Sequence, residues 1–213
     1  MVIKLRKNLI EIAQDRLELK KSIDLFCFSF AIILAILIIL KCFVFNSVLV
    51  SGTSMCNTLD NGDLVLVNKI DKIDRGDVIV FYAITIDENG NYQFKVDANN
   101  NRFFYIKRVI ALEGETVYWV DGKVSVKTVN GEIINLEENY ANGETYTHNF
   151  YGDNDKGIVV EKGKYFVLGD NRFISNDSRG TIGQVDGQIV LGVVTDWSIK
   201  FKNTFLRFLY KLF

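Results

Sequence analysis

The sequence lacks proline altogether and contains only three cysteines and one histidine among its 213 residues. Average proline usage is about 5%, so its absence is a bias that matters at one motif position below. Cys27, Cys42 and Cys56 are odd in number and widely spaced, which gives neither a disulfide framework nor a Cys-x-x-Cys metal site. No Gly-rich phosphate-binding loop or zinc ligand set is present. We therefore expect no metal and no cofactor.

The sequence also has no large excess of acidic over basic residues, or of basic over acidic residues. The 26 acidic and 25 basic residues give a formal net charge of −1, which does not favour nucleic acid as a partner. Histidine-based catalysis would depend on His148 alone, and nothing around it is suited to orient an imidazole. Ser–His–Asp catalysis through His148, or a Cys56 nucleophile paired with His148, stay as alternatives without an orienting context.

One long apolar segment lies near the N-terminus. Residues 25–40 are uncharged, and the run continues past Lys41 to Phe45, which reaches the ~20 residues needed to span hydrocarbon. It exceeds the ~7–15 residues of a signal-peptide core, and no small-x-small cleavage site follows. We predict a transmembrane helix over residues 23–45. The basic segment 1–22 predicts a single-pass protein of the cell membrane with its N-terminus in the cytoplasm and the rest extracellular.

The exported part has the pattern of antiparallel β-structure. Short runs rich in β-branched and aromatic residues alternate with Gly, Asn and Asp turns, and no long amphipathic helix lies between residues 50 and 195. The runs cover residues 48–50, 64–67, 78–86, 103–112, 116–120, 124–126, 165–168 and 189–195. The fold class is therefore mostly β.

Composition divides this part further. Residues 121–162 are polar, Gly/Asn-rich and weakly patterned, and we predict an inserted smaller β lobe there, within a catalytic core of residues 46–120 and 163–197. Residues 198–213 have apolar residues at helical spacing with basic residues opposite, which predicts a basic amphipathic helix. Such a helix can lie on an anionic membrane surface or pack on the β domain, and both alternatives stay open.

Ser54 and Lys107 are the candidate catalytic pair. A serine hydroxyl is a weak nucleophile until a neighbouring base takes its proton. A lysine can be that base only if desolvation leaves it neutral near the working pH. Side chains alternate along a strand, which places Lys107 among apolar neighbours and the permanently charged Arg108 on the opposite face. Those neighbours are Phe103, Tyr105, Val109 and Ala111.

A third stretch, residues 169–180, combines charges and hydroxyl groups in twelve positions directly after a predicted strand. The opposite charges of Asp170 and Arg172, and of Asp177 and Arg179, predict charge-assisted bracing of a rigid turn. A rigid turn beside an active site can offer a hydroxyl group that orients the base.

Four motifs in order resemble the signature motifs of bacterial type I signal peptidases of the S26 peptidase family. They are Ser54-Met55-x-x-Thr58-Leu59, Arg75-Gly76-Asp77-Val78, Tyr105-Ile106-Lys107-Arg108-Val109 and the segment 169–179. Together with the preceding anchor they extend to about Trp197, and residues 87–100 and 121–162 are unmatched in detail. The single anchor is similar to that of Gram-positive-type members.

The resemblance implies a membrane-bound serine endopeptidase with a mostly-β catalytic domain. It would remove signal peptides from secretory preproteins after Ala-x-Ala-like sites, with Ser54 as nucleophile and Lys107 as general base. By motif position Ser175 would hold the lysine, Asp177 and Arg179 would brace the last motif, and Arg108 is the arginine that follows the base. The Ser54 N–H would donate to the oxyanion. The residues around the substrate's approach would be Gly52, Thr53 and Met55.

Two positions depart from the family pattern. Asn57 replaces the usual proline, which removes a restraint on φ, although asparagine tolerates turn conformations. Gly52 stands where some members have a serine that contributes an oxyanion donor, and glycine lets a substrate backbone approach closely.

Other functions compete with preprotein cleavage. A catalytically silent relative could assist assembly of pilus subunits, and pilin precursors are a candidate specialised substrate. Retention of both Ser54 and Lys107 favours the enzyme, because a scaffold has no need for a buried amine opposite a serine. Self-cleaving repressors share Ser/Lys chemistry, but they would need a DNA-binding module where this chain has an anchor.

Overall fold

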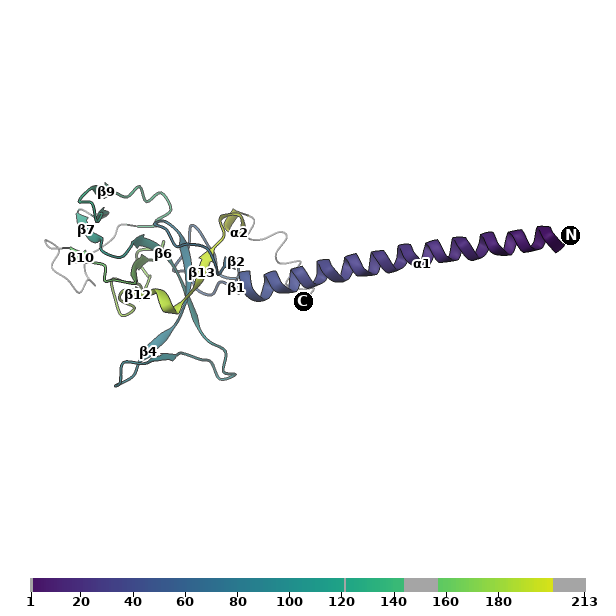
Figure 1. Cartoon of the computed structure of the whole chain (residues 1–213). Helices are drawn as coiled ribbons and strands as arrows, with labels where there is room; N and C mark the ends of the chain where they lie inside the picture. Colours follow the sequence, from purple (N-terminus) through teal and green to yellow (C-terminus); the bar gives the residue numbers. More distant parts are fainter. Residues whose placement is uncertain (1, 121, 144–156, 201–213) are drawn as a thin grey trace. The chain divides into compact units, whose positions relative to one another are not determined.

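The computed structural model describes residues 2–120, 122–143 and 157–200. The chain forms two compact units, Met1–Val44 and Phe45–Phe213. The first is helical: α1 (Val2–Ile39) is followed by a π-helical turn, Leu40–Val44 (Figure 1). Within it, Gln14–Val44 is long and apolar enough to cross a membrane, with a mean hydropathy of 2.9 in its most apolar window. Residues 2–22 of the predicted basic segment are thus helical and continuous with the apolar run.

The second unit is built on a seven-stranded sheet of order β1-β2-β13-β3-β6-β11-β12. Its strands are β1 (Phe45–Leu49), β2 (Leu64–Asn68), β3 (Val78–Tyr82), β6 (Phe104–Ala111), β11 (Lys164–Leu168), β12 (Val185–Asp186) and β13 (Val190–Val194). Every pairing is antiparallel. The predicted mostly-β antiparallel fold class is confirmed.

Residues 116–159 contribute a second, four-stranded antiparallel sheet of order β10-β7-β8-β9. Its strands are β7 (Thr116–Val120), β8 (Lys123–Lys127), β9 (Ile133–Asn135) and β10 (Ile158–Val159). Residues 116–120 were predicted to belong to the core of residues 46–120, and in the structure β7 pairs with β8 along its full length. Two residues connect Val120 to Lys123, a loop length typical of a tight hairpin between consecutive strands.

Three smaller elements complete the described part. A ribbon of β4 (Ile84–Ile86) and β5 (Tyr92–Phe94) extends from β3. A 3-10 turn, Gly187–Ile189, precedes β13, and α2 (Asp196–Lys200) follows it. The remainder of the predicted C-terminal helix, residues 201–213, lies outside the described residues.

Strand β6 carries the candidate base because of where it lies in the sheet. It pairs with β3 from Phe104 to Arg108, and on its other side β11 pairs with it from Arg108 onward. A bulge between Phe166 and Val167 shifts the register there. Within the described part of the chain, no strand therefore pairs with residues 104–107 on the side of the groove described below.

Candidate active site

Ser54 lies on a tight turn that is fixed from both sides. The backbone N–H of Cys56 donates to the Thr53 carbonyl (3.2 Å), and the N–H groups of Thr58 and Leu59 donate to the Met55 carbonyl (3.0 and 2.8 Å). Met55 is only 2% exposed and packs in a core cluster with residues of β2, β3 and β13. These hydrogen bonds and this packing hold the turn that carries Ser54 rigidly in place.

The two unusual motif positions have left-handed backbone conformations. Gly52 has φ +97° and donates its N–H to the Asn61 side-chain oxygen (3.0 Å). Asn57 has φ +90°, a value that the pyrrolidine ring of proline cannot adopt. Asparagine is one of the few residues that enter this region readily. The backbone conformation at position 57 therefore excludes proline.

The side chain of Lys107 points at Ser54. Its Nζ donates to Ser54 Oγ (2.8 Å) and to the Ile106 carbonyl (2.9 Å), and the residue is 3% exposed. Among the described residues no carboxylate forms an ion pair with it. Burial lowers the pKa of Lys107 to about 8, although the negative charges of Asp177 and Asp170 oppose the shift. A substantial neutral fraction of the amine follows at mildly alkaline pH.

The predicted apolar face around Lys107 is only partly as expected. Tyr105 and Val109 pack in one cluster, whereas Ala111 belongs to another cluster and Phe103 is 52% exposed. The register shift places two steps of β6, from Val109 to Ala111, opposite one step of β11, so the irregularity in β6 changes which of its residues share a face; Phe103 precedes the strand.

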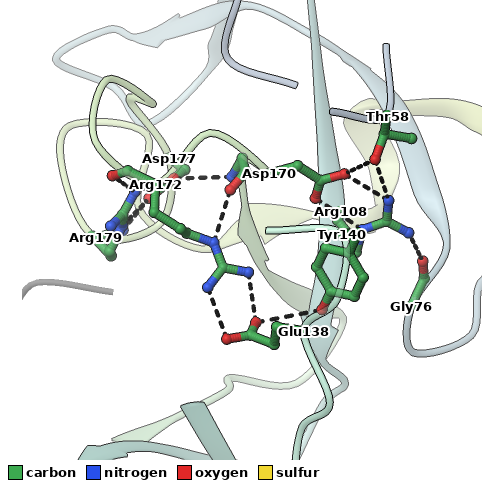
Figure 2. A network of polar contacts seen from close by, with 10 residues as sticks. Thr58, Gly76, Arg108, Glu138, Tyr140, Asp170, Arg172, Asp177 and Arg179 are labelled. Atoms are coloured by element: carbon green, nitrogen blue, oxygen red, sulfur yellow. Dashed lines mark hydrogen bonds and ion pairs between the residues drawn. The ribbon is translucent and has the colours of Figure 1, made fainter. Parts of the chain in front are cut away.

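Arg108 faces away from the dyad and is bound on every side. Its Nε and Nη2 donate to the two oxygens of Asp170 (2.9 and 2.6 Å), and Nη1 donates to the Gly76 carbonyl (2.7 Å). Nη2 also donates to Thr58 Oγ1 (3.1 Å), and the Thr58 hydroxyl donates to Asp170. The guanidinium carbon lies 4.0 Å from the centre of the Tyr140 ring (Figure 2).

The loop after β11 is braced by two more arginines. Arg179 binds both oxygens of Asp177 (2.8 Å each), and Asp177 accepts from the Gly169 N–H (3.0 Å). Arg172 donates to the Gly169 carbonyl (2.9 Å) and to both oxygens of Glu138 (3.0 and 2.5 Å). Figure 2 shows these pairs converging on one network.

The predicted Asp177–Arg179 contact is present, but the predicted bracing of Asp170 by Arg172 is wrong. Asp170 pairs with Arg108 instead, and Arg172 pairs with Glu138. The reason is that both partners come from other parts of the chain, 62 and 34 residues away, which a pattern confined to one loop does not contain.

The Ser175 backbone N–H donates to the Asn171 carbonyl (3.1 Å), but its side chain forms no hydrogen bond among the described residues. Its Oγ is buried and has no partner among the described residues, so the predicted contact with Lys107 is not formed in this structure. A Cβ placed on Gly169 would lie 2.1 Å from Ser175 Oγ and 2.6 Å from the Ser54 carbonyl oxygen. Only glycine fits at 169, because the nucleophile turn and the Ser175 side chain meet there. The role of Ser175 stays a prediction.

The dyad lies in a groove of about 220 Å³. The groove is bounded by residues 48–55 on one side and residues 102–107 on the other. Backbone groups of Phe103 and Val109 bond toward β3, and alternation turns those of Phe104 and Ile106 toward the groove. The Ile106 carbonyl, which Lys107 Nζ reaches, confirms this direction.

Sequence reasoning missed Glu138 and Tyr140, which lie in a weakly patterned segment without a motif. It also missed the ion pair of Arg75 with Glu115 (2.6 Å), which anchors the second motif. His148 lies outside the described residues. Cys56 is half-buried. Within the described ranges, no three His, Cys, Asp or Glu side chains are grouped so as to hold a metal.

Comparisons with known proteins agree on one family. The family model described as signal peptidase, peptidase S26, matches residues 23–197. Signal peptidase I of Bacillus licheniformis is 34% identical over 169 residues, 76% of this chain and 80% of its own length. Signal peptidase IB of Staphylococcus aureus (strain COL) is 31% identical over 188 residues, 83% of this chain and 90% of its own. A solved signal peptidase I from Enterococcus faecalis V583 is 28% identical, covers 59% of this chain and 99% of its own, and has a TM-score of 0.39.

The family model and the curated relatives define the class of protein, a serine endopeptidase of the hydrolases. The chain belongs to the signal peptidase family, peptidase S26. Cleavage of signal peptides is the activity of this family. The alternative of a silent pilus-assembly partner finds no support, because the relatives are named as peptidases.

Proposed function

We propose that the chain is a membrane-anchored Ser/Lys endopeptidase that cleaves signal peptides from secretory preproteins, with Ser54 as nucleophile and Lys107 as general base. The observation that carries the proposal is the 2.8 Å contact between Lys107 Nζ and Ser54 Oγ, made by an amine that is 3% exposed. A base must be within hydrogen-bond reach of the proton that it takes, and must have a pKa near the working pH.

Neutral Lys107 takes the Ser54 hydroxyl proton as Oγ forms a bond to the scissile carbonyl carbon. The carbonyl oxygen becomes an oxyanion, for which the Ser54 N–H is the candidate donor, with Gly52 and Thr53 lining its approach. The ammonium of Lys107 then gives its proton to the leaving amine as the C–N bond breaks, which leaves an acyl-enzyme. Neutral again, Lys107 removes a proton from a water molecule that attacks the ester carbon; the bond from this carbon to Ser54 Oγ then breaks, and the Lys107 ammonium returns the proton to Oγ.

The substrate would lie extended along the groove. Phe104 and Ile106 direct backbone groups into it that pair with no strand among the described residues, although the Ile106 carbonyl accepts from Lys107 Nζ, and an extended peptide can pair with such an edge. Met55 and Val50 line the groove with bulk and are nearly fully buried, which favours small side chains such as those of Ala-x-Ala-like sites. A pilin precursor with such a site would be a specialised substrate.

Anchoring is part of the proposal. The segment Gln14–Val44 provides a membrane-length apolar helix, and Lys/Arg residues precede its apolar core. A basic flank favours the cytoplasm, so residues 1–22 would be cytoplasmic, residues 23–45 would span the cell membrane once, and the β unit would be extracellular. The core of residues 46–120 and 163–197 would hold the dyad, with the lobe of residues 121–162 inserted.

The proposal is tested with the full chain in detergent and a secretory preprotein as substrate. We expect Ser54→Ala and Lys107→Ala to abolish cleavage, while Cys56→Ser and His148→Ala retain most of it. Normal cleavage by Lys107→Ala would refute the dyad. A pilin precursor assayed in parallel distinguishes general from specialised substrates.

A further inference from the structure

Residues 138–143, here called the strap, leave the second sheet and cross the site's polar network. The N–H of Asn142 donates to the Asp170 carbonyl (2.7 Å), and the N–H of Arg172 donates to the Asn142 carbonyl (3.0 Å). These two bonds form a parallel bridge between Asn142 and Asn171. Backbone pairing therefore attaches the strap to the loop that follows β11.

Two side chains of the strap strengthen this attachment. Glu138 binds the buried Arg172 through both oxygens, and the two side chains are 13% and 0% exposed. The Tyr140 ring supports the guanidinium of Arg108 at 4.0 Å. The strap thus contacts both arginines that hold the first residues of the loop, as Figure 2 shows.

The loop in turn holds the nucleophile turn. The N–H of Asn171 donates to the Ser54 carbonyl (3.0 Å), and its side-chain amide donates to the Thr53 carbonyl (3.2 Å). Asn171 lies between Asp170 and Arg172, the residues bound by Arg108 and Glu138. A continuous set of contacts therefore runs from the strap through two arginines and the loop to the backbone of Ser54.

We propose that Glu138 and Tyr140 are positioning residues for the reaction, and that the strap fixes the Ser54 turn by clamping the loop at residues 170–172. The inference rests on the proposed Ser54/Lys107 chemistry and adds the second sheet to the catalytic machinery. Near-attack geometry is demanding: a displacement of about 1 Å can cost about a hundredfold in rate. Neither strap residue lines the substrate groove, so the expected loss is in kcat and not in KM.

The test compares kcat and KM of full-length variants in detergent on a preprotein, normalised to the folded fraction measured by tryptophan fluorescence. Tyr140→Leu removes the support of Arg108 and is expected to lower kcat between about ten- and a hundredfold. Tyr140→Phe keeps the ring and is expected to be close to wild type, because the hydroxyl makes only a 3.4 Å contact with Glu138. Recovery by the conservative variant separates positioning from loss of folding.

Glu138→Gln is paired with Glu137→Gln, since Glu137 is the exposed neighbour and the change in charge is the same. We expect the former to lower kcat and the latter to leave it unchanged. A wild-type kcat per folded molecule in both Tyr140→Leu and Glu138→Gln would overturn the inference, as would equal losses in Glu138→Gln and Glu137→Gln. Ser54→Ala in the same assay separates the two proposals: if it still cleaves, the proposed function fails, whereas an inactive Ser54→Ala beside fully active strap variants refutes the strap alone.

Discussion

Lys107 and Arg108 are neighbouring residues of β6 that differ in how their basic groups are accommodated away from water. Both are long cationic side chains that are largely removed from water. Arg108 contacts a carboxylate through two hydrogen bonds, whereas the described contacts of Lys107 are to a hydroxyl and a carbonyl. Burial therefore lowers the pKa of Lys107 to about 8, while Arg108 keeps its charge.

The difference extends to the regions around them. The Arg108 side is a network of ion pairs in which three arginines each bind a carboxylate. The Lys107 side is held by backbone hydrogen bonds of a turn and by apolar packing of Met55 and Leu59. The carboxylates of this network are bound by the three arginines, and among the described residues none of them forms an ion pair with Lys107 that would keep the amine protonated.

The largest expected effect on activity comes from replacing Lys107 with arginine, the residue type found at position 108. Lys107→Arg keeps a cation beside Ser54 but removes the ability to release a proton. We expect kcat/KM to fall by at least about a thousandfold, because general-base catalysis and activation of the nucleophile are both lost. Initial rates of preprotein cleavage measure this, and substantial activity of Lys107→Arg would mean that the base lies elsewhere.

The next largest expected effect is on the free energy of unfolding, when Asp170 loses its ion-pair partner Arg108. Arg108→Met leaves Asp170 buried without its bidentate cation, which costs about 3–5 kcal/mol when one member of a buried pair is removed. Urea unfolding of the full chain in detergent is the measurement. A midpoint equal to that of wild type would show that the Arg108–Asp170 pair contributes little.

The matched change on the dyad side should have the opposite sign. Lys107→Met removes a buried amine whose charged form is disfavoured, so we expect a gain of about 1–3 kcal/mol at pH 7 together with loss of activity. In wild type the folded pKa of about 8 lies below the model value of 10.5, so the folded state binds fewer protons in this window. Stability from this group therefore rises with pH between about 8 and 10.5 and is lowest below 8.

Unfolding curves at several pH values test that window. Lys107→Met should lose the rise that wild type shows, with Lys164→Met as a control because Lys164 is a partly exposed lysine on β11. If the two variants have the same pH dependence, the amine at 107 is not the group that titrates.

The smallest effect concerns the turn itself. Asn57→Gly relieves a left-handed φ of +90° and should change stability by no more than about 1 kcal/mol. Asn57→Pro restores the usual family residue but cannot adopt this φ, so it should destabilise by more than that. Thermal unfolding measures the stability of both variants. A higher melting temperature for Asn57→Pro than for wild type would contradict the left-handed conformation at position 57.

Much of the dyad side could be predicted from sequence, because its chemistry lies in short local patterns. The strand around Lys107 and the turn at Ser54 are marked by apolar alternation and a compact motif. The braced side could not be predicted in the same way. Glu138 reaches Arg172 over 34 residues and Arg108 reaches Asp170 over 62, so the partners depend on the tertiary fold.

The fold shows the same limit. The strand runs could be predicted because β-branched residues are concentrated in them, but the order of the strands in the sheets depends on the tertiary fold. Strands β5, β9, β10 and β12 were missed because each has only two or three residues. The positive φ of Asn57 also escaped prediction, since asparagine is compatible with several turn conformations.

The central claim is that burial lowers the pKa of the Lys107 amine, which forms no ion pair with a carboxylate among the described residues and lies within reach of Ser54. It is tested most directly by an NMR pH titration of the full chain in detergent with lysine labelled at Cε, the Lys107 signal being assigned by its absence in Lys107→Met. The account predicts an apparent pKa of about 8 for that signal. A pKa at the ordinary lysine value of 10.5 would contradict it.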